Sequence, residues 1–268
     1  MKNIIRTFLV VVVCLGVVVT PVKAQTPTPV PFIVPPGGIA IIGFDFVNDK
    51  FTIVCLSQIP ANTTILFTDN GWNSNNNTFR TGEGVNYWDA PNGCELGKVI
   101  TLDFSVLYRY KTYSDMSLAE LGDQIFVYQE KSDGNPRFIF GLNTRGTDWT
   151  NATNANTSAL PAELASLNPS PSISVPQSPY AVYSKLKRDF DSTTAALAYL
   201  TDLTNWTTSP TTLLMPTGDF SFTTTAVHMS DFRAETGGET APWWVLVGLV
   251  VVPVVVMVFN RPKKDCCK

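Results

Sequence analysis

Histidine is almost missing from this sequence of 268 residues. The single one, His228, lies outside the central part of the chain, in a polar stretch near the C-terminal apolar run. Catalytic triads and Cys/His pairs need an imidazole as general base, and many zinc sites need it as a ligand. No glycine-rich phosphate loop follows a strand-like segment and opens a helix. We therefore expect no enzyme, no cofactor and no metal site.

Long apolar runs occur only at the two ends. The first run, residues 8–19, follows Lys2 and Arg6 and leads to the small residue Ala24, a suitable cleavage site for signal peptidase. A charged head, a short apolar body and such a cleavage site are typical of a cleavable signal peptide, here residues 1–24. The alternative is an N-terminal membrane helix, but the run is shorter than the roughly 20 apolar residues that a span needs.

The second run predicts a membrane anchor. Residues 242–259 form an apolar run that carries Trp243 and Trp244 near its start and is interrupted by a tolerated proline, Pro253; the basic tail 260–268 follows. We expect one transmembrane helix, with the bulk of the chain outside and the tail in the cytoplasm, at the plasma membrane or another membrane of the secretory pathway. A buried core helix is a weaker alternative. A GPI signal, whose apolar tail is removed, is the stronger one.

The sequence contains few cysteines, and the predicted topology places each of them in a particular compartment. Cys14 leaves with the signal peptide, and Cys266 and Cys267 lie in the predicted cytoplasmic tail, where they are candidates for palmitoylation. Only Cys55 and Cys94 reach the oxidising side. We expect them to form a disulfide, the alternative being two free buried thiols.

Basic residues are too few for nucleic-acid binding. The signal peptide and the tail hold seven of the 19 basic residues and one of the 22 acidic ones, which leaves 12 against 21 for the ectodomain, a net charge of about −9. Such a balance repels phosphate backbones.

N-glycosylation acceptors, by contrast, are frequent. The pattern Asn-x-Ser/Thr predicts a surface glycoprotein. It occurs at Asn62, Asn76, Asn151, Asn156 and Asn205.

The central part of the chain is typical of an all-β protein. A Pro-rich linker, residues 25–37, precedes an ectodomain at 38–223, and a polar stalk follows at 224–241. Short β-like segments separated by turn residues favour an antiparallel sandwich or barrel. They lie at 39–46, 51–56, 63–68, 85–88, 98–104, 124–128 and 137–141.

Two further segments depart from this strand pattern. A short helix is expected from Ser192, its cap, to Trp206, with Ala196, Leu200 and Leu203 on one face. Residues 145–180 are either a long ordered loop or a loose insert.

Four segments resemble a known family. Residues 38–44 and 59–72 carry a strand, a Pro-initiated turn and a strand that ends at Gly71-Trp72. A strand initiated by Gly122-Asp123 and a second one, at 138–143, follow. This order resembles secreted β-domains related to the lamin tail domain. The resemblance implies an immunoglobulin-like sandwich that mediates contacts, and it implies no shared activity.

Carboxylates and aromatic rings are the remaining candidates for chemistry. Asp69, Asp89 and Asp123 leave acid/base chemistry or calcium binding open, although Asp69-Asn70-Gly71 is more simply a turn. Trp72, Tyr87 and Trp88 are sugar-stacking candidates or core residues.

These observations favour a single-pass cell-surface glycoprotein that binds an extracellular protein or glycan, in adhesion or recognition. A coat component that assembles laterally is the second hypothesis, and a glycan-active domain that uses carboxylates alone is the third.

Overall fold

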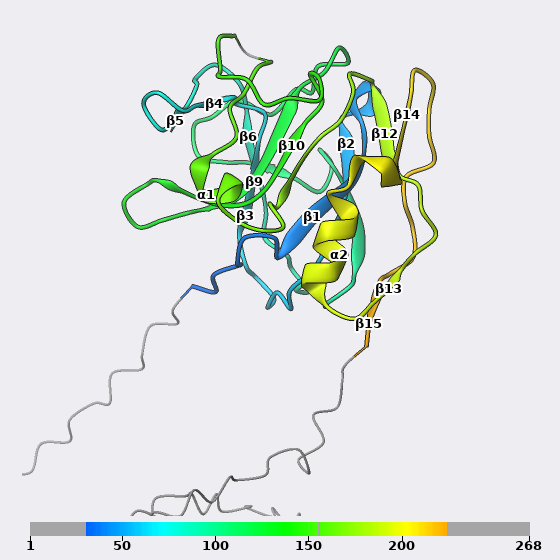
Figure 1. Cartoon of the computed structure of the whole chain (residues 1–268). Helices are drawn as coiled ribbons and strands as arrows, with labels where there is room; N and C mark the ends of the chain where they lie inside the picture. The colour runs from blue at the N-terminus through cyan, green and yellow to red at the C-terminus, as the bar shows by residue number, and fades with distance from the viewer. Residues whose placement is uncertain (1–30, 155, 224–268) are drawn as a thin grey trace, which may run out of the picture. The chain divides into compact units, whose positions relative to one another are not determined.

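A computed structural model describes residues 31–154 and 156–223 (Figure 1). These residues belong to one compact unit that ends at Thr224. The predicted signal peptide, stalk, membrane anchor and tail, with Cys266 and Cys267, lie outside the described residues. Within the described ranges, no helix has both the length and the apolar character needed to cross a bilayer.

The described residues form a protein made mostly of β-strands, with two main sheets. The five-stranded sheet has the order β14 (Trp206–Ser209), β12 (Tyr180–Tyr183), β1 (Ile39–Asp45), β2 (Lys50–Cys55) and β7 (Val99–Asp103). The six-stranded sheet has the order β11 (Ser172–Ser174), β10 (Pro136–Asn143), β9 (Gln124–Glu130), β3 (Ile65–Thr68), β6 (Val85–Trp88) and β8 (Tyr108–Arg109).

The main hydrophobic core draws its side chains from both sheets. Successive side chains of a strand point to opposite faces, so each strand of the six-stranded sheet supplies two layers. Ile65 and Phe67 of β3 belong to the main core, whereas Leu66 between them belongs to a second cluster. Both faces of this sheet are therefore covered by apolar side chains along its central strands.

Aromatic rings dominate the second cluster. The hairpin of β4 (Trp72–Asn73) and β5 (Thr78–Phe79) and the short helix α1 (Ala162–Ala165) contribute to it. The Trp72 ring lies 5.0 Å from the Phe138 ring and 5.3 Å from the Phe79 ring, both edge to face. Such pairs add to the stabilisation that comes from burial alone.

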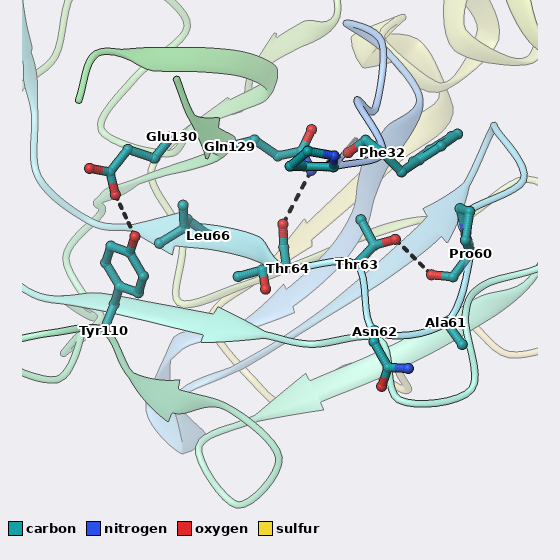
Figure 2. A pocket seen from close by; sticks show the side chains of 11 residues that line it. Phe32, Pro60, Ala61, Asn62, Thr63, Thr64, Leu66, Tyr110, Gln129 and Glu130 are labelled. Atoms are coloured by element: carbon teal, nitrogen blue, oxygen red, sulfur yellow. Dashed lines mark hydrogen bonds between the residues drawn. The ribbon is translucent and has the colours of Figure 1, made fainter. Parts of the chain in front are cut away.

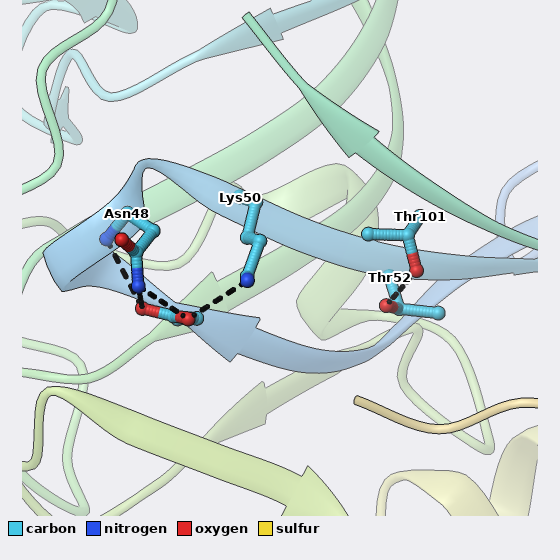
Figure 3. Close-up of polar contacts among 5 residues, drawn as sticks. Asn48, Lys50, Thr52 and Thr101 are labelled. Carbon is cyan, nitrogen blue, oxygen red and sulfur yellow. Dashed lines mark hydrogen bonds and ion pairs between the residues drawn. The ribbon is translucent and has the colours of Figure 1, made fainter. Parts of the chain in front are cut away.

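The β1–β2 connection is held by a buried carboxylate. Asp45 Oδ1 accepts a hydrogen bond of 3.0 Å from the Asn48 amide and so caps the 3-10 turn Phe46–Asn48. Its Oδ2 lies 3.1 Å from Lys50 Nζ. The Asn48 and Lys50 side chains are labelled in Figure 3. On β2, Thr52 Oγ1 lies 2.8 Å from Thr101 Oγ1 of β7, which joins the neighbouring strands by a side-chain hydrogen bond.

The predicted helix begins where expected and ends early. Ser192 Oγ accepts a hydrogen bond of 3.1 Å from the Ala195 amide, and α2 (Thr193–Leu200) follows and packs beside β1 (Figure 1). Trp206 is not helical as predicted, because its backbone pairs with Tyr183 in the five-stranded sheet. Its indole Nε1 donates to Leu200 O at 2.7 Å, which closes the chain against the end of α2.

The region 145–180 contains regular structure, including one strand that pairs parallel with its neighbour. It contains α1 and β11, and β11 pairs parallel with β10. A second parallel pair joins β13 (Asp189–Phe190) to β15 (Ser221–Phe222). These two pairs depart from the predicted antiparallel sandwich, and each includes a strand of only two or three residues.

The predicted disulfide is confirmed. It joins Cys55, the last residue of β2, to Cys94, and the two Cα atoms are 6.3 Å apart. Both cysteines are buried, and Cys94 also forms an isolated antiparallel bridge with Ile59.

Candidate functional site

An open groove of about 770 Å³ lies beside β3 and β9 of the six-stranded sheet. Figure 2 shows its lining, which comes from segments far apart in the sequence. These are residues 31–32, the turn 60–64, Leu66, Tyr110 and residues 129–130. Its walls combine apolar surface with amide, hydroxyl and carboxylate groups.

Gln129 fastens the N-terminal segment to the wall of the groove. Its Oε1 accepts a hydrogen bond of 2.9 Å from the Val34 amide, and its Nε2 donates to Phe32 O at 3.0 Å. The same Nε2 is 3.3 Å from Thr64 O on the way into β3. One side chain of β9 therefore holds the entering chain and the β3 side of the groove together.

Tyr110 presents a ring that is held from two sides. Its hydroxyl donates to Glu130 Oε2, as Figure 2 shows. Lys111 Nζ lies 2.7 Å from both Glu130 oxygens and 4.8 Å from the centre of the Tyr110 ring. The hydrogen bond from Lys111, followed by that from Tyr110, lowers the pKa of Glu130. The carboxylate is therefore ionised at neutral pH and fixes the ring.

A row of tyrosines extends from the groove to the edge strand β8. The Tyr87 ring lies 5.6 Å from Tyr108 and 6.0 Å from Tyr110, and the Tyr110 ring is stacked at 6.4 Å on Tyr113. Tyr108 is 59 % exposed and Tyr113 is 48 % exposed. The row thus offers ring surface to solvent next to the groove.

The rim of the groove carries a predicted glycosylation site. Asn62 is exposed, with a φ of 62° in the left-handed region that asparagine tolerates, and its amide donates to Ala90 O at 2.9 Å. Thr63 Oγ1 donates to Pro60 O at 2.7 Å and closes the turn. Thr64 Oγ1 donates to Asp89 Oδ1 at 2.7 Å. The candidate Asp89 is therefore placed next to the groove.

The structure brings the other two candidate carboxylates together, deep in the protein. Asp69 accepts hydrogen bonds of 2.8 Å from the amides of Gly84 and Ser117. Asp123 accepts bonds of 2.8 Å from the amides of Ala119 and Gln124. Both residues are 1 % exposed, so they hold the backbone of converging loops in place and are closed to solvent.

Glu83 joins this cluster, although the sequence did not single it out. Burial, followed by the charges of Asp123 and Asp69, raises its pKa to about 8. Burial also raises the pKa of Asp123 to about 8 and that of Asp69 to about 6. The only local signal was a carboxylate between two glycines. At Gly84, a Cβ would approach the Met116 amide nitrogen to 2.1 Å, so the loop carrying Glu83 is pressed against residues 115–116.

Two of the three aromatic candidates are core residues. Trp72 and Trp88 are 6 % and 7 % exposed and belong to the second cluster and the main core. Tyr87 is half-buried beside Tyr108 and Tyr110. The tyrosines that carry exposed ring surface, Tyr108 and Tyr113, follow no motif in the sequence.

The five glycosylation acceptors differ in exposure. Asn62 and Asn76 are exposed, and Asn151 and Asn156 are half-buried. Asn205 is 5 % exposed, and its Nδ2, the atom that would carry a glycan, donates to Tyr199 O at 2.8 Å. A glycan on Asn205 is incompatible with this packing.

Within the part of the chain that the structure describes, no three His, Cys, Asp or Glu side chains are arranged to hold a metal ion.

Comparisons of the chain with protein-family models, with curated proteins and with solved structures found no match.

Proposed function

We propose that this protein is a single-pass cell-surface glycoprotein whose ectodomain binds a glycan on an extracellular partner, in adhesion or recognition. The observation that carries the proposal is the groove with the fixed Tyr110 ring on its wall. Concave sites with a few fixed polar groups among apolar surface are the usual form of a ligand site. The predicted signal peptide and C-terminal anchor would place this groove outside the cell.

The chemistry of the groove suits a sugar ring better than a compact apolar ligand. Tyr110 and the exposed Phe32 supply apolar surface for the C–H face of a sugar. The Glu130 carboxylate and the Lys111 ammonium lie beside the Tyr110 ring and would bond the hydroxyls at a sugar's edge. Because Tyr110 is already hydrogen-bonded and packed against Lys111, little side-chain freedom is lost on binding.

A glycan on Asn62 would stand at the rim of this groove and limit access to it. Asn62 is exposed and lines the groove, as Figure 2 shows. We infer that the occupancy of Asn62 sets how much of the surface population can bind. Replacing Asn62 by Gln should then increase binding while leaving Tyr110 in place.

The finer fold assignment is also a proposal: an immunoglobulin-like sandwich related to the lamin tail domain. Three local features support it: the turn that Thr63 closes on Pro60, the glycine before Trp72 and the start of β9 after Gly122. An experimental structure with this strand connectivity would test it, and a different connectivity would contradict it.

The binding proposal is tested on a glycan array with the purified full-length chain and three variants. Tyr110→Ala removes the ring and should reduce binding at least tenfold, whereas Tyr110→Phe removes only the hydroxyl and should retain part of it. Tyr199→Ala removes another half-buried tyrosine, one that lines no part of the groove, and should leave binding unchanged. If the wild-type chain bound no glycan and captured a protein without sugars instead, the glycan assignment would be wrong.

A further inference from the structure

A second, smaller pocket of about 170 Å³ lies beside the hairpin β4–β5 and the strand β9. Three aromatic side chains line it: Phe79 from β5, Tyr113 from the segment after β8, and Tyr128 from β9. Tyr113 is 48 % exposed, so the pocket is reached from solvent at this ring. Tyr113 also stacks on Tyr110, which lines the groove.

The aromatic lining is backed by a larger group of rings. Phe79 lies 5.3 Å from Tyr128 and 5.7 Å from Phe126. Tyr128 is buried, and this burial raises the pKa of its phenol, so the ring is neutral throughout the physiological range. Neutral rings around a small space attract a cation through their negatively charged faces.

A carboxyl group with one unpaired oxygen completes the lining. Glu83 lines the pocket, and its Oε2 is buried and accepts no hydrogen bond from any described residue. Asp69 and Asp123 lie close enough to raise the pKa of Glu83, but their own oxygens accept backbone amides. Glu83 is therefore the carboxyl of this cluster that lines the pocket and retains a buried oxygen with no hydrogen bond from a described residue.

We propose that this pocket binds a small organic ammonium cation of about the size of choline, held by Phe79, Tyr113 and Tyr128 and neutralised by Glu83. A metal ion fits less well, because the described residues contain no group of three His, Cys, Asp or Glu side chains that could hold one. A neutral apolar ligand fits less well because it gains nothing from the ionised form of Glu83, whereas a cation is attracted both to that carboxylate and to the faces of the rings.

Arg80 is the positive group that competes for the same carboxylate. It lines the pocket, and its Nη1 lies 3.3 Å from Ala152 O, so it is engaged with the loop at 152. The other titratable groups around Glu83 are Asp69, Asp123, Tyr113 and Tyr128. With the pKa of Glu83 at about 8, a bound cation expels a proton, and the affinity should rise as the pH increases from 6 to 9.

The test is calorimetric titration of the purified full-length chain, in a detergent without ammonium groups, with choline and with its neutral isostere 3,3-dimethylbutan-1-ol. Choline should bind at least tenfold more tightly than the isostere, and more tightly at pH 9 than at pH 6. Glu83→Gln should weaken choline binding about tenfold and remove the dependence on pH. Tyr113→Leu should weaken it as well, whereas Tyr108→Leu, an exposed ring that does not line the pocket, should not.

Three results would overturn the proposal. The first is that the wild-type chain does not bind choline. This includes the case in which only Arg80→Ala binds it, because the guanidinium of Arg80 fills the pocket in the wild-type chain. The second is equal affinity for choline and the neutral isostere. The third is unchanged choline binding by both Tyr113→Leu and Glu83→Gln, with near-ultraviolet circular dichroism showing that the two variants are folded.

Discussion

At the scale of single residues, the free-energy cost of burying a charged carboxyl group sets the pKa values of the buried aspartates. Asp123 and Asp69 accept backbone hydrogen bonds that favour the ionised form, yet burial outweighs them and raises both pKa values. In both residues the amide hydrogen bonds do not repay the loss of water around the carboxylate.

The buried carboxylates make stability depend on pH. Their pKa values in the folded chain, about 6 for Asp69 and about 8 for Glu83 and Asp123, exceed those of an unfolded chain. The folded state therefore holds more protons than the unfolded state between about pH 4 and pH 8, and the unfolding free energy should fall as the pH rises through this window. We expect a loss of a few kcal/mol between pH 5 and pH 9, measured by urea unfolding.

Two variants identify the group responsible for this loss. Asp123→Asn removes a titrating carboxyl and should flatten the dependence on pH. Asp133→Asn changes an exposed carboxyl, whose pKa is lowered by hydrogen bonds from Asn135, and should leave the slope above pH 5 as it is. Equal slopes in the wild-type chain and in Asp123→Asn would show that Asp123 is not buried in its protonated form.

Burial also predicts which acceptor asparagine stays free of glycan. Asn205 donates from Nδ2 to Tyr199 O and is enclosed, whereas Asn62 and Asn76 are exposed. Mass mapping after enzymatic deglycosylation should show occupancy at Asn62 and Asn76 and none at Asn205. In parallel, Asn205→Gln should lower the unfolding free energy by about 1 kcal/mol or more, because a buried hydrogen bond is lost. A glycan on Asn205 in the folded protein would contradict the packing around Tyr199.

At the scale of elements, each site is made where strands from distant parts of the chain pair. The groove needs β3 beside β9, with Phe67 opposite Val127, and β6 beside β8, with Tyr87 opposite Tyr108. A register shift of one residue would turn Leu66 and Tyr128 to the other face of their sheet and remove both from the second cluster. The sites therefore depend on registers that the hydrophobic layers enforce on both faces.

The disulfide stabilises the end of β2 by joining it to the loop at Cys94. The linked residues are 39 positions apart, so cleavage enlarges the freedom of the unfolded chain. The double variant Cys55→Ala, Cys94→Ala should lose about 3–4 kcal/mol of unfolding free energy in urea. Its m-value should rise, because the uncrosslinked unfolded chain exposes more surface. The same m-value and the same midpoint as the wild-type chain would show that the bridge contributes nothing.

At the scale of the whole molecule, we expect the ectodomain to lie outside a membrane that residues 242–259 span. A type I topology predicts that protease added to intact cells removes most of the chain and leaves a small membrane-held fragment. The reason is that the predicted span at 242–259 separates the predicted ectodomain from the basic segment 260–268. Release of the intact ectodomain by a phosphatidylinositol-specific lipase would instead show a GPI anchor.

Local patterns in the sequence were sufficient for part of this protein. The strands at 39–45, 50–55 and 124–130 occur where β-branched and aromatic residues are bounded by turn residues, and Ser192 caps α2 as its side chain predicts. The pairing of Cys55 with Cys94 followed from the count of cysteines on the oxidising side. These features depend on neighbouring residues or on a count, so no tertiary information was needed.

Other features were decided only by the tertiary structure. Trp206 joins a strand because Tyr183 lies opposite it, and the segment around β11 is ordered because β10 offers it an edge. The pKa of Glu83 is raised because the fold buries this carboxyl and also brings Asp123 and Asp69 to its side. Proximity and burial of this kind come from pairings between residues far apart in the sequence, and the free energy of a charged or aromatic group depends on those surroundings.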